Sequence, residues 1–179
     1  MNRFVIADPE RCIGCRTCEV ACAVSHQASD AQGTVQANAP FHPRLKLVVT
    51  ERITTPILCR QCEDKPCAMA CPNQAIVTEN GCVTVRQERC IGCKSCVVAC
   101  PYGAMNVVVT ETAPESDSLF AKAHKKAHAL KCDLCGHRAD GPACVSVCPT
   151  QALRLVTPDD LEQERRRKQL ASALALQPV

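Results

Sequence analysis

The sequence predicts an α+β fold of two similar halves, built around groups of cysteines rather than around a large apolar core. Sixteen of the 17 cysteines fall into four groups of four. The chain of 179 residues has no Trp and only four aromatic side chains, Phe4, Phe41, Tyr102 and Phe120. Aromatic residues usually contribute much of the buried area of a core. We therefore expect metal-bound thiolates to fill the core, and the metal-free chain to be poorly folded.

The motif at residues 90–101 carries the most specific chemical information in the chain. It reads CIGCKSCVVACP, with the spacing C-x2-C-x2-C-x3-C-P. With this spacing the thiolates of bacterial ferredoxins hold a [4Fe–4S] cluster, and the fourth cysteine ligates a neighbouring cluster. The motif therefore predicts iron–sulfur clusters and a partner motif elsewhere in the chain.

A motif with almost the same loop lies near the start of the chain. Residues 4–7 predict a short strand, and residues 12–22 follow with the spacing C-x2-C-x2-C-x3-C. The loop CIGCRTC of this first motif closely resembles CIGCKSC of the motif at 90–101, which indicates an internal repeat. The repeat departs at one point, because Ala23 rather than proline follows the fourth cysteine.

The second motif, at residues 59–72, leads into the motif at 90–101 through a predicted hairpin. Its spacing is C-x2-C-x4-C-x3-C-P. Residues 75–78 and 82–85 are β-rich runs that flank Asn80-Gly81, and this arrangement is a strong hairpin signal. Motif, hairpin, motif is the layout of a two-cluster ferredoxin-like module.

The fourth motif, at residues 132–149, has the spacing C-x2-C-x8-C-x3-C-P and precedes a predicted strand at residues 152–156. Pairing of this strand with residues 4–7 would give the outer motifs the same hairpin arrangement as the inner pair. Thr157-Pro158-Asp159-Asp160 predicts the start of a helix that runs to about Leu174.

These elements predict two pseudo-symmetric ferredoxin-like modules with short β-hairpins and a cluster-filled core, each with two [4Fe–4S] clusters, followed by a C-terminal helix. Residues 45–50 and 105–109 also have the pattern of strands. The predicted boundaries are an outer module of residues 1–26 plus 127–157, an inner module of residues 55–110, insertions at 27–54 and 111–126, and a helical tail at 158–179.

Zinc sites and disulfides are the alternatives to iron–sulfur clusters. Two separated C-x2-C pairs around one zinc ion would suit motifs two and four, whereas the three close cysteines of motifs one and three crowd a single tetrahedral ion. The odd number of cysteines, the cluster spacing and a first motif that begins at Cys12, with no room for a signal peptide, disfavour a secreted disulfide scaffold. We therefore expect [4Fe–4S] clusters and a reducing, cytoplasmic location.

Composition and charge argue against several functions. The net charge of +3 gives no case for binding nucleic acid or membrane lipid, and no apolar run approaches the roughly 18–20 residues of a membrane span. The sequence contains no Gly-rich nucleotide motif, no Ser/His/Asp arrangement and no open metal site. It therefore predicts an electron carrier rather than an enzyme.

Several features outside the motifs have two interpretations. Cys82 suits a small buried apolar side chain better than a ligand or a redox sensor. The charged run from Lys122 to His128 suits a solvated face better than a docking patch for an acidic partner. The tail helix suits packing on its own chain and docking on a partner subunit equally well. The histidines lack the spacing of metal ligands and are expected at the surface or in loops: His26, His42, His124, His128 and His137.

The chain resembles the four-cluster ferredoxin-type iron–sulfur subunits that partner molybdopterin oxidoreductases. Within this family it is similar to small subunits associated with formate dehydrogenase and formate hydrogenlyase. The resemblance covers nearly the whole chain and is weakest in the insertions and the tail. Four stretches carry it: the opening MNRFVIAD, CIGCRTCEVAC at residues 12–22, CRQCED at residues 59–64 and CDLC at residues 132–135.

The resemblance implies that each cluster takes three cysteines from one motif and one from its partner motif, an exchange that the two-cluster spacing also predicts. All sixteen cysteines are present, so four [4Fe–4S] clusters are expected. The implied ligands are Cys12, Cys15, Cys18 and Cys148 for cluster 1; Cys22, Cys132, Cys135 and Cys144 for cluster 2; Cys59, Cys62, Cys67 and Cys100 for cluster 3; and Cys71, Cys90, Cys93 and Cys96 for cluster 4.

The resemblance also implies a catalytic partner, which is a molybdenum or tungsten bis-pterin subunit of the formate dehydrogenase type, and a second redox partner such as a hydrogenase. Single electrons would pass between the two partners along the clusters. Two other functions stay open: a maturation or assembly factor for formate dehydrogenase, and a homo-oligomeric subunit that polymerises into a cluster-bearing filament.

Overall fold

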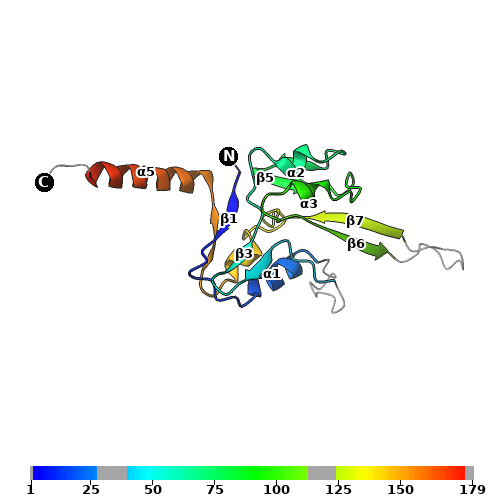
Figure 1. The fold of residues 1–179 in the computed structure, drawn as a ribbon, viewed down its shortest axis with the longest axis horizontal. Helices are drawn as coiled ribbons and strands as arrows, with labels where there is room; N and C mark the ends of the chain where they lie inside the picture. Colours follow the sequence, from blue (N-terminus) through cyan, green and yellow to red (C-terminus); the bar gives the residue numbers. More distant parts are fainter. Residues whose placement is uncertain (1, 28–39, 113–123, 176–179) are drawn as a thin grey trace, which may run out of the picture.

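A computed structural model describes residues 2–27, 40–112 and 124–175 (Figure 1). In this part of the chain five helices and eight strands are interspersed, and the strands form four separate sheets of two strands each. All four pairs are antiparallel. The predicted mixture of short helices and small hairpins is confirmed.

The first and last strands form one hairpin-like pair. β1 (Phe4–Ala7) pairs with β8 (Leu153–Val156), with Phe4 opposite Val156. Val5 on β1 is fully buried against the apolar side of this pair. The predicted pairing of these two segments is confirmed, and it brings the first and fourth motifs together.

The second predicted hairpin is also present. β4 (Ile76–Glu79) pairs with β5 (Cys82–Val85). The turn residues Asn80 and Gly81 have φ angles of 51° and 68°. The two-residue turn that is favoured in hairpins requires positive φ at both positions. Asn-Gly adopts these angles readily. The pair connects the second motif to the third.

Each motif contains one short helix that begins just before its third cysteine. In three motifs proline follows the fourth cysteine. A proline disfavours helical backbone at the residue that precedes it. Cys100 before Pro101 is accordingly extended, with ψ of 113°. In the first motif Ala23 stands at the place of the proline. The helix of that motif continues past it and is nine residues long in all. The four helices are α1 (Thr17–Ser25), α2 (Pro66–Met69), α3 (Ser95–Ala99) and α4 (Ala143–Ser146).

Two further hairpins include residues expected in the insertions. β2 (Lys46–Val49) pairs with β3 (Thr54–Ile57), and β6 (Asn106–Thr112) pairs with β7 (His124–Leu130). Strands were expected at residues 45–50 and 105–109, but β3 and β7 were not. Charged side chains in β7 hide its strand pattern, because its sequence is HKKAHAL.

α5 (Pro158–Ala175) follows β8 directly, as its start signal predicts. Thr157 and Asp160 cap it reciprocally: the Thr157 amide donates to Asp160 Oδ2 at 2.8 Å, and the Asp160 amide donates to Thr157 Oγ1 at 3.3 Å. No residue of α5 is buried, and Figure 1 shows the helix extending away from the body. The interpretation of the tail as a helix packed on its own chain is therefore wrong. Among the residues described, none of the helices has the length and apolarity needed to cross a membrane.

Candidate metal centre

Three cavities are each lined by four cysteines. We number the cysteine sets after the clusters that they are expected to bind. The three cavities are lined by set 1 (Cys12, Cys15, Cys18 and Cys148), set 3 (Cys59, Cys62, Cys67 and Cys100) and set 4 (Cys71, Cys90, Cys93 and Cys96).

The remaining cysteines, set 2, are all buried. Their exposed fractions are 6% for Cys22, 9% for Cys132, 5% for Cys135 and 4% for Cys144. Burial, reinforced by the nearby thiols of Cys22 and Cys135, raises the pKa of Cys144 to about 12. Cluster ligands are thiolates, so binding a cluster here must release protons from these buried thiols.

The four sets fit [4Fe–4S] clusters by number and by chemistry. Each set supplies four thiols, three from one motif and one from its partner motif, and a cubane needs four. The rest of the walls is largely apolar, with Leu47 and Leu153 beside set 1 and Ile76 and Val107 beside set 4.

Backbone amides donate hydrogen bonds to several of these sulfur atoms. The amide of Arg44 lies 3.2 Å from Cys22 Sγ, that of Ala75 lies 3.3 Å from Cys71 Sγ, and that of Gln61 lies 3.4 Å from Cys59 Sγ. Such donors stabilise negative charge on sulfur and influence the reduction potential of a bound cluster.

The loops of motifs one and three repeat each other in detail. Thr17 Oγ1 lies 3.2 Å from Cys15 Sγ, and Ser95 Oγ lies 3.5 Å from Cys93 Sγ. Hydrogen bonding to these hydroxyl side chains lowers the pKa of Cys15 and of Cys93. Both cysteines are exposed, and they are the only two exposed cysteines of the chain.

Each of these loops is covered by one of the two unexpected hairpins. Gly14 has φ of 73°, and a Cβ there would lie 3.0 Å from Thr54 Cγ2 on β3. Gly92 has φ of 69°, and a Cβ there would lie 2.2 Å from Ala127 Cβ on β7. Glycine is therefore required for both the backbone angle and the close approach. The β2–β3 hairpin, which includes part of the first expected insertion, covers the cysteine loop of set 1, and β7 covers that of set 4 at a residue expected in the outer module.

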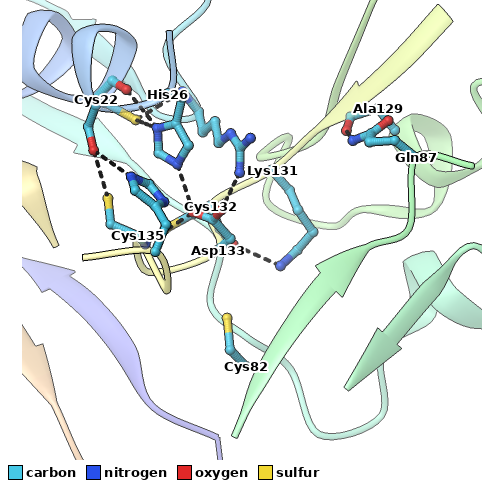
Figure 2. A network of polar contacts seen from close by, with 12 residues as sticks. Cys22, His26, Cys82, Gln87, Ala129, Lys131, Cys132, Asp133 and Cys135 are labelled. Atoms are coloured by element: carbon cyan, nitrogen blue, oxygen red, sulfur yellow. Dashed lines mark hydrogen bonds and ion pairs between the residues drawn. The ribbon is translucent and has the colours of Figure 1, made fainter. Parts of the chain in front are cut away.

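His26 lies in a polar network beside set 2 (Figure 2). Its Nδ1 donates to the carbonyl oxygen of Cys22 at 2.7 Å, and its Nε2 donates to Asp133 Oδ1 at 2.9 Å. Burial opposes a charged imidazole, but these contacts outweigh it and raise the pKa of His26 to about 10. His26 lies in the turn that follows α1, as expected of a loop residue, but its side chain is only 8% exposed and pairs with Asp133.

The same network resembles a metal-ligand group, but the ligand atoms of His26 and Asp133 are already engaged. His26, Asp133 and His137 have donor atoms within 4.8 Å of one another. Both nitrogens of His26 donate to oxygen acceptors, however, and the Arg44 guanidinium pairs with Asp133 Oδ2. This group is therefore an ion-pair network that holds the loop of Cys132 and Cys135 against α1.

Gln61 and Lys131 form a second buried network, which motif spacing did not identify. Each is 2% exposed. Gln61 Nε2 donates to the carbonyl oxygen of Cys132 at 2.8 Å, and Gln61 Oε1 accepts from the amide of Val83 at 2.8 Å. These contacts join the loop of set 3 to the loop of set 2. The available sequence signal is position, since Gln61 lies inside one C-x2-C pair and Lys131 directly precedes another.

The remaining predictions concern Cys82 and the charged run. Cys82 is 5% exposed, and burial raises the pKa of its thiol, so the interpretation as a small buried side chain is confirmed. In the charged run, Lys126 on β7 is exposed, as a solvated face requires, and Lys122 lies outside the described residues.

These cysteine sets define an iron–sulfur protein of the ferredoxin type, and the comparisons with known proteins agree. Residues 50–157 match the 4Fe-4S dicluster domain family, and residues 9–25 match the 4Fe-4S binding domain family. The chain belongs to the 4Fe-4S dicluster family. Its cofactors are therefore [4Fe–4S] clusters.

The relatives place the chain more narrowly. It is 53% identical to the electron transport protein HydN of Escherichia coli, over 97% of this chain and 99% of HydN. It is 39% identical to formate hydrogenlyase subunit 2, over 94% of this chain and 88% of that protein, and 38% identical to hydrogenase-4 component A, over 97% and 91%, both from E. coli. The predicted resemblance is confirmed, and the chain is an electron carrier rather than an enzyme.

Proposed function

We propose that the chain is a relay for single electrons that carries four [4Fe–4S] clusters, one on each cysteine set. The observation that supports this most directly is the convergence of sixteen cysteines into four sets of four, each drawn from two motifs. When bound, a [4Fe–4S] cluster supplies a site that accepts and releases one electron. The chain's own residues determine how these sites are spaced, shielded and tuned.

The sets follow one another in the order 1, 2, 3, 4. Burial is the main cause of the raised pKa of Cys144, Cys132 and Cys96, and a thiol of a neighbouring set adds to each shift. Cys18 of set 1 acts on Cys144 of set 2. Cys59 of set 3 acts on Cys132 of set 2, and Cys67 of set 3 acts on Cys96 of set 4. These contacts support a linear path.

We infer two pseudo-symmetric modules along this path. The outer module takes residues 1–26 and 127–157, and the inner module takes residues 55–110. Two separate groups of buried side chains support this division, one around Val5 and Leu153 and one around Ile76 and Val83. The Gln61 and Lys131 network lies between them.

Electrons enter and leave at the two ends. Cys15 of set 1 and Cys93 of set 4 are exposed, whereas all four cysteines of set 2 are buried. A redox partner can approach sets 1 and 4 closely, and it cannot approach set 2 without displacing protein. This difference in exposure supports transfer through the chain rather than delivery at its middle.

The partners that we propose are a molybdenum or tungsten bis-pterin subunit of the formate dehydrogenase type at one end, and a hydrogenase or other redox subunit at the other. The relatives named formate hydrogenlyase subunit 2 and hydrogenase-4 component A support this choice. A cytoplasmic location follows from the need to keep sixteen thiols reduced for cluster binding.

Iron analysis and electron paramagnetic resonance (EPR) of the anaerobically purified chain test the relay. We expect about 16 irons per chain, four for each of four clusters, and EPR signals of interacting reduced clusters. Zinc in place of iron, or far fewer irons, would contradict the proposal. Affinity purification from native cells tests the partners: a stoichiometric oxidoreductase subunit, with clusters that become reduced on addition of formate or hydrogen, is expected.

A further inference from the structure

Lys131 is a charged side chain enclosed where sets 2 and 3 meet. It directly precedes Cys132 of set 2, and it lines the cavity of set 3. Its Nζ donates to the carbonyl oxygen of Val83, to that of Cys132 at 2.9 Å and to Gln61 Oε1 at 3.3 Å. Figure 2 shows the side chain reaching past the Cys132–Asp133 loop toward the inner module.

The contacts of Lys131 satisfy its hydrogen bonds but not its charge. All three acceptors are neutral oxygen atoms. Within residues 2–27, 40–112 and 124–175, no carboxylate forms an ion pair with Lys131. Asp133 is close in sequence, but it pairs with His26 and Arg44. A buried ammonium without a compensating negative charge is strongly unfavourable, so the protein must supply that charge in another form.

Thiols of both adjoining sets lie within the electrostatic reach of Lys131. Lys131 and Cys67 line the same cavity, that of set 3. The Lys131 Nζ also lies 2.9 Å from the carbonyl oxygen of Cys132, a member of set 2. The ammonium therefore favours negative charge on both sets at once.

We propose that Lys131 is the counter-cation of the two middle clusters, a positioning residue that makes the clusters on sets 2 and 3 easier to reduce. This inference rests on the proposed function. Thiolate-ligated clusters carry net negative charge, which increases on reduction. A fixed positive charge in a poorly hydrated site stabilises the more negative state more strongly than the same charge in water.

Gln61 holds Lys131 in this position. Its side-chain oxygen accepts from both Lys131 Nζ and the Val83 amide, and its side-chain nitrogen donates to the Cys132 carbonyl oxygen. Both ends of the amide are therefore used, and the Gln61 backbone adopts a φ of 53°, which non-glycine residues seldom adopt. The amide fixes the distance between the ammonium and the two sets.

The test is a redox titration of the full chain, followed by EPR, in the Lys131→Gln variant purified anaerobically. We expect full iron content and about a tenfold fall in the reduction equilibrium constant of a middle cluster, which is about 59 mV for a one-electron couple. Lys131→Arg keeps the charge and should restore the wild-type potential. A purely structural role for Lys131 would change the rate of cluster loss and leave the potentials unchanged.

Two lysines serve as controls. Lys94 lines the cavity of set 4 but is exposed, so Lys94→Gln should shift a potential several-fold less because water screens its charge. Lys168 lies on α5 with 74% of its side chain exposed, so Lys168→Gln should shift none.

Gln61→Glu keeps the test decisive if Lys131→Gln does not assemble. The variant preserves the lysine and gives it a carboxylate, so the middle clusters should again become harder to reduce. Unchanged potentials in iron-replete variants of both kinds would overturn the inference. Zinc, or much less than about 16 irons in the wild-type chain, would instead overturn the proposed function, so the two failures are distinguishable.

Discussion

Sets 2 and 4, which we propose to bind the same kind of cluster, lie in opposite surroundings. All four cysteines of set 2 are buried, and an ion-pair network with His26 and Asp133 adjoins Cys22. In set 4 only Cys96 is buried, Cys93 is exposed, and the cavity lies beneath the β6–β7 hairpin. Four cysteines from two motifs therefore do not by themselves give equal protection.

The difference begins with one residue in each motif. Pro72 follows Cys71, the matching ligand of set 4, and α2 ends after four residues, whereas Ala23 follows Cys22 and α1 continues to Ser25. The added turn brings Ser25 within 3.1 Å of His137 and His26 within 2.9 Å of Asp133. A missing proline thereby gives set 2 a polar support that set 4 lacks.

Removal of a set 2 ligand has the largest expected effect. Cys22→Ser should lose one cluster, so that iron falls by about four per chain, from about 16 to about 12. Cys82→Ser removes another buried cysteine that belongs to no set, and it should keep all the iron. Iron and sulfide analysis of the purified variants checks both. Equal iron loss in the two variants would show that Cys82 had been wrongly left out of the ligand sets.

The next largest effect tests the role of the missing proline. Ala23→Pro removes an amide donor from the middle of α1, at about 3 kcal/mol, and should separate His26 from Asp133. Chelator-driven loss of absorbance should then become faster, with EPR reporting set 2 as the cluster lost first. Ala23→Gly is the matched control, with about 1 kcal/mol of helix destabilisation and an intact network. Unaltered loss kinetics in the proline variant would mean that α1 does not protect set 2.

The corresponding change at set 4 is Gly92→Ala. The new Cβ would meet Ala127 Cβ at 2.2 Å and would strain the positive φ, so we expect about 2 kcal/mol of destabilisation and selective loss of the set 4 cluster. Gly81→Ala also has a positive φ, but no atom lies within 4 Å of its Cβ, so it should cost about 1 kcal/mol and spare the clusters. EPR during controlled chelation distinguishes the two outcomes. If both variants lose set 4 equally, the contact with β7 is irrelevant.

The smallest predicted effect concerns the cap of α5, and this change should leave both cysteine sets unaltered. Thr157→Ala removes the hydroxyl cap of α5, at about 1 kcal/mol of helix stability. Hydrogen exchange of the full chain should show faster exchange of the amides in the first turn of α5, with iron content and EPR spectra as in the wild type. Any change in either cluster set would mean that α5 contacts the body of the protein.

Sequence spacing predicted what is local, and it missed what depends on distant partners. The four motifs, the β4–β5 turn at Asn80-Gly81 and the start of α5 all depend on neighbours within a few residues. His26 and Asp133, by contrast, are 107 residues apart, and Lys131 and Gln61 are 70 apart. No local pattern in a single sequence encodes such pairs. β7 was missed for a related reason, since Lys125 and Lys126 give it a polar sequence, while Ala127 and Ala129 of the same strand cover set 4.

The distribution of exposed cysteines also affects unwanted chemistry. Cys15 and Cys93, at the two ends of the proposed path, are exposed, and set 2 in its interior is buried. An electron held in the interior is shielded from small oxidants such as dioxygen, while an electron at either tip can be lost to them as easily as to a partner. Oxidative damage should therefore begin at the exposed sets 1 and 4 and reach the buried set 2 later.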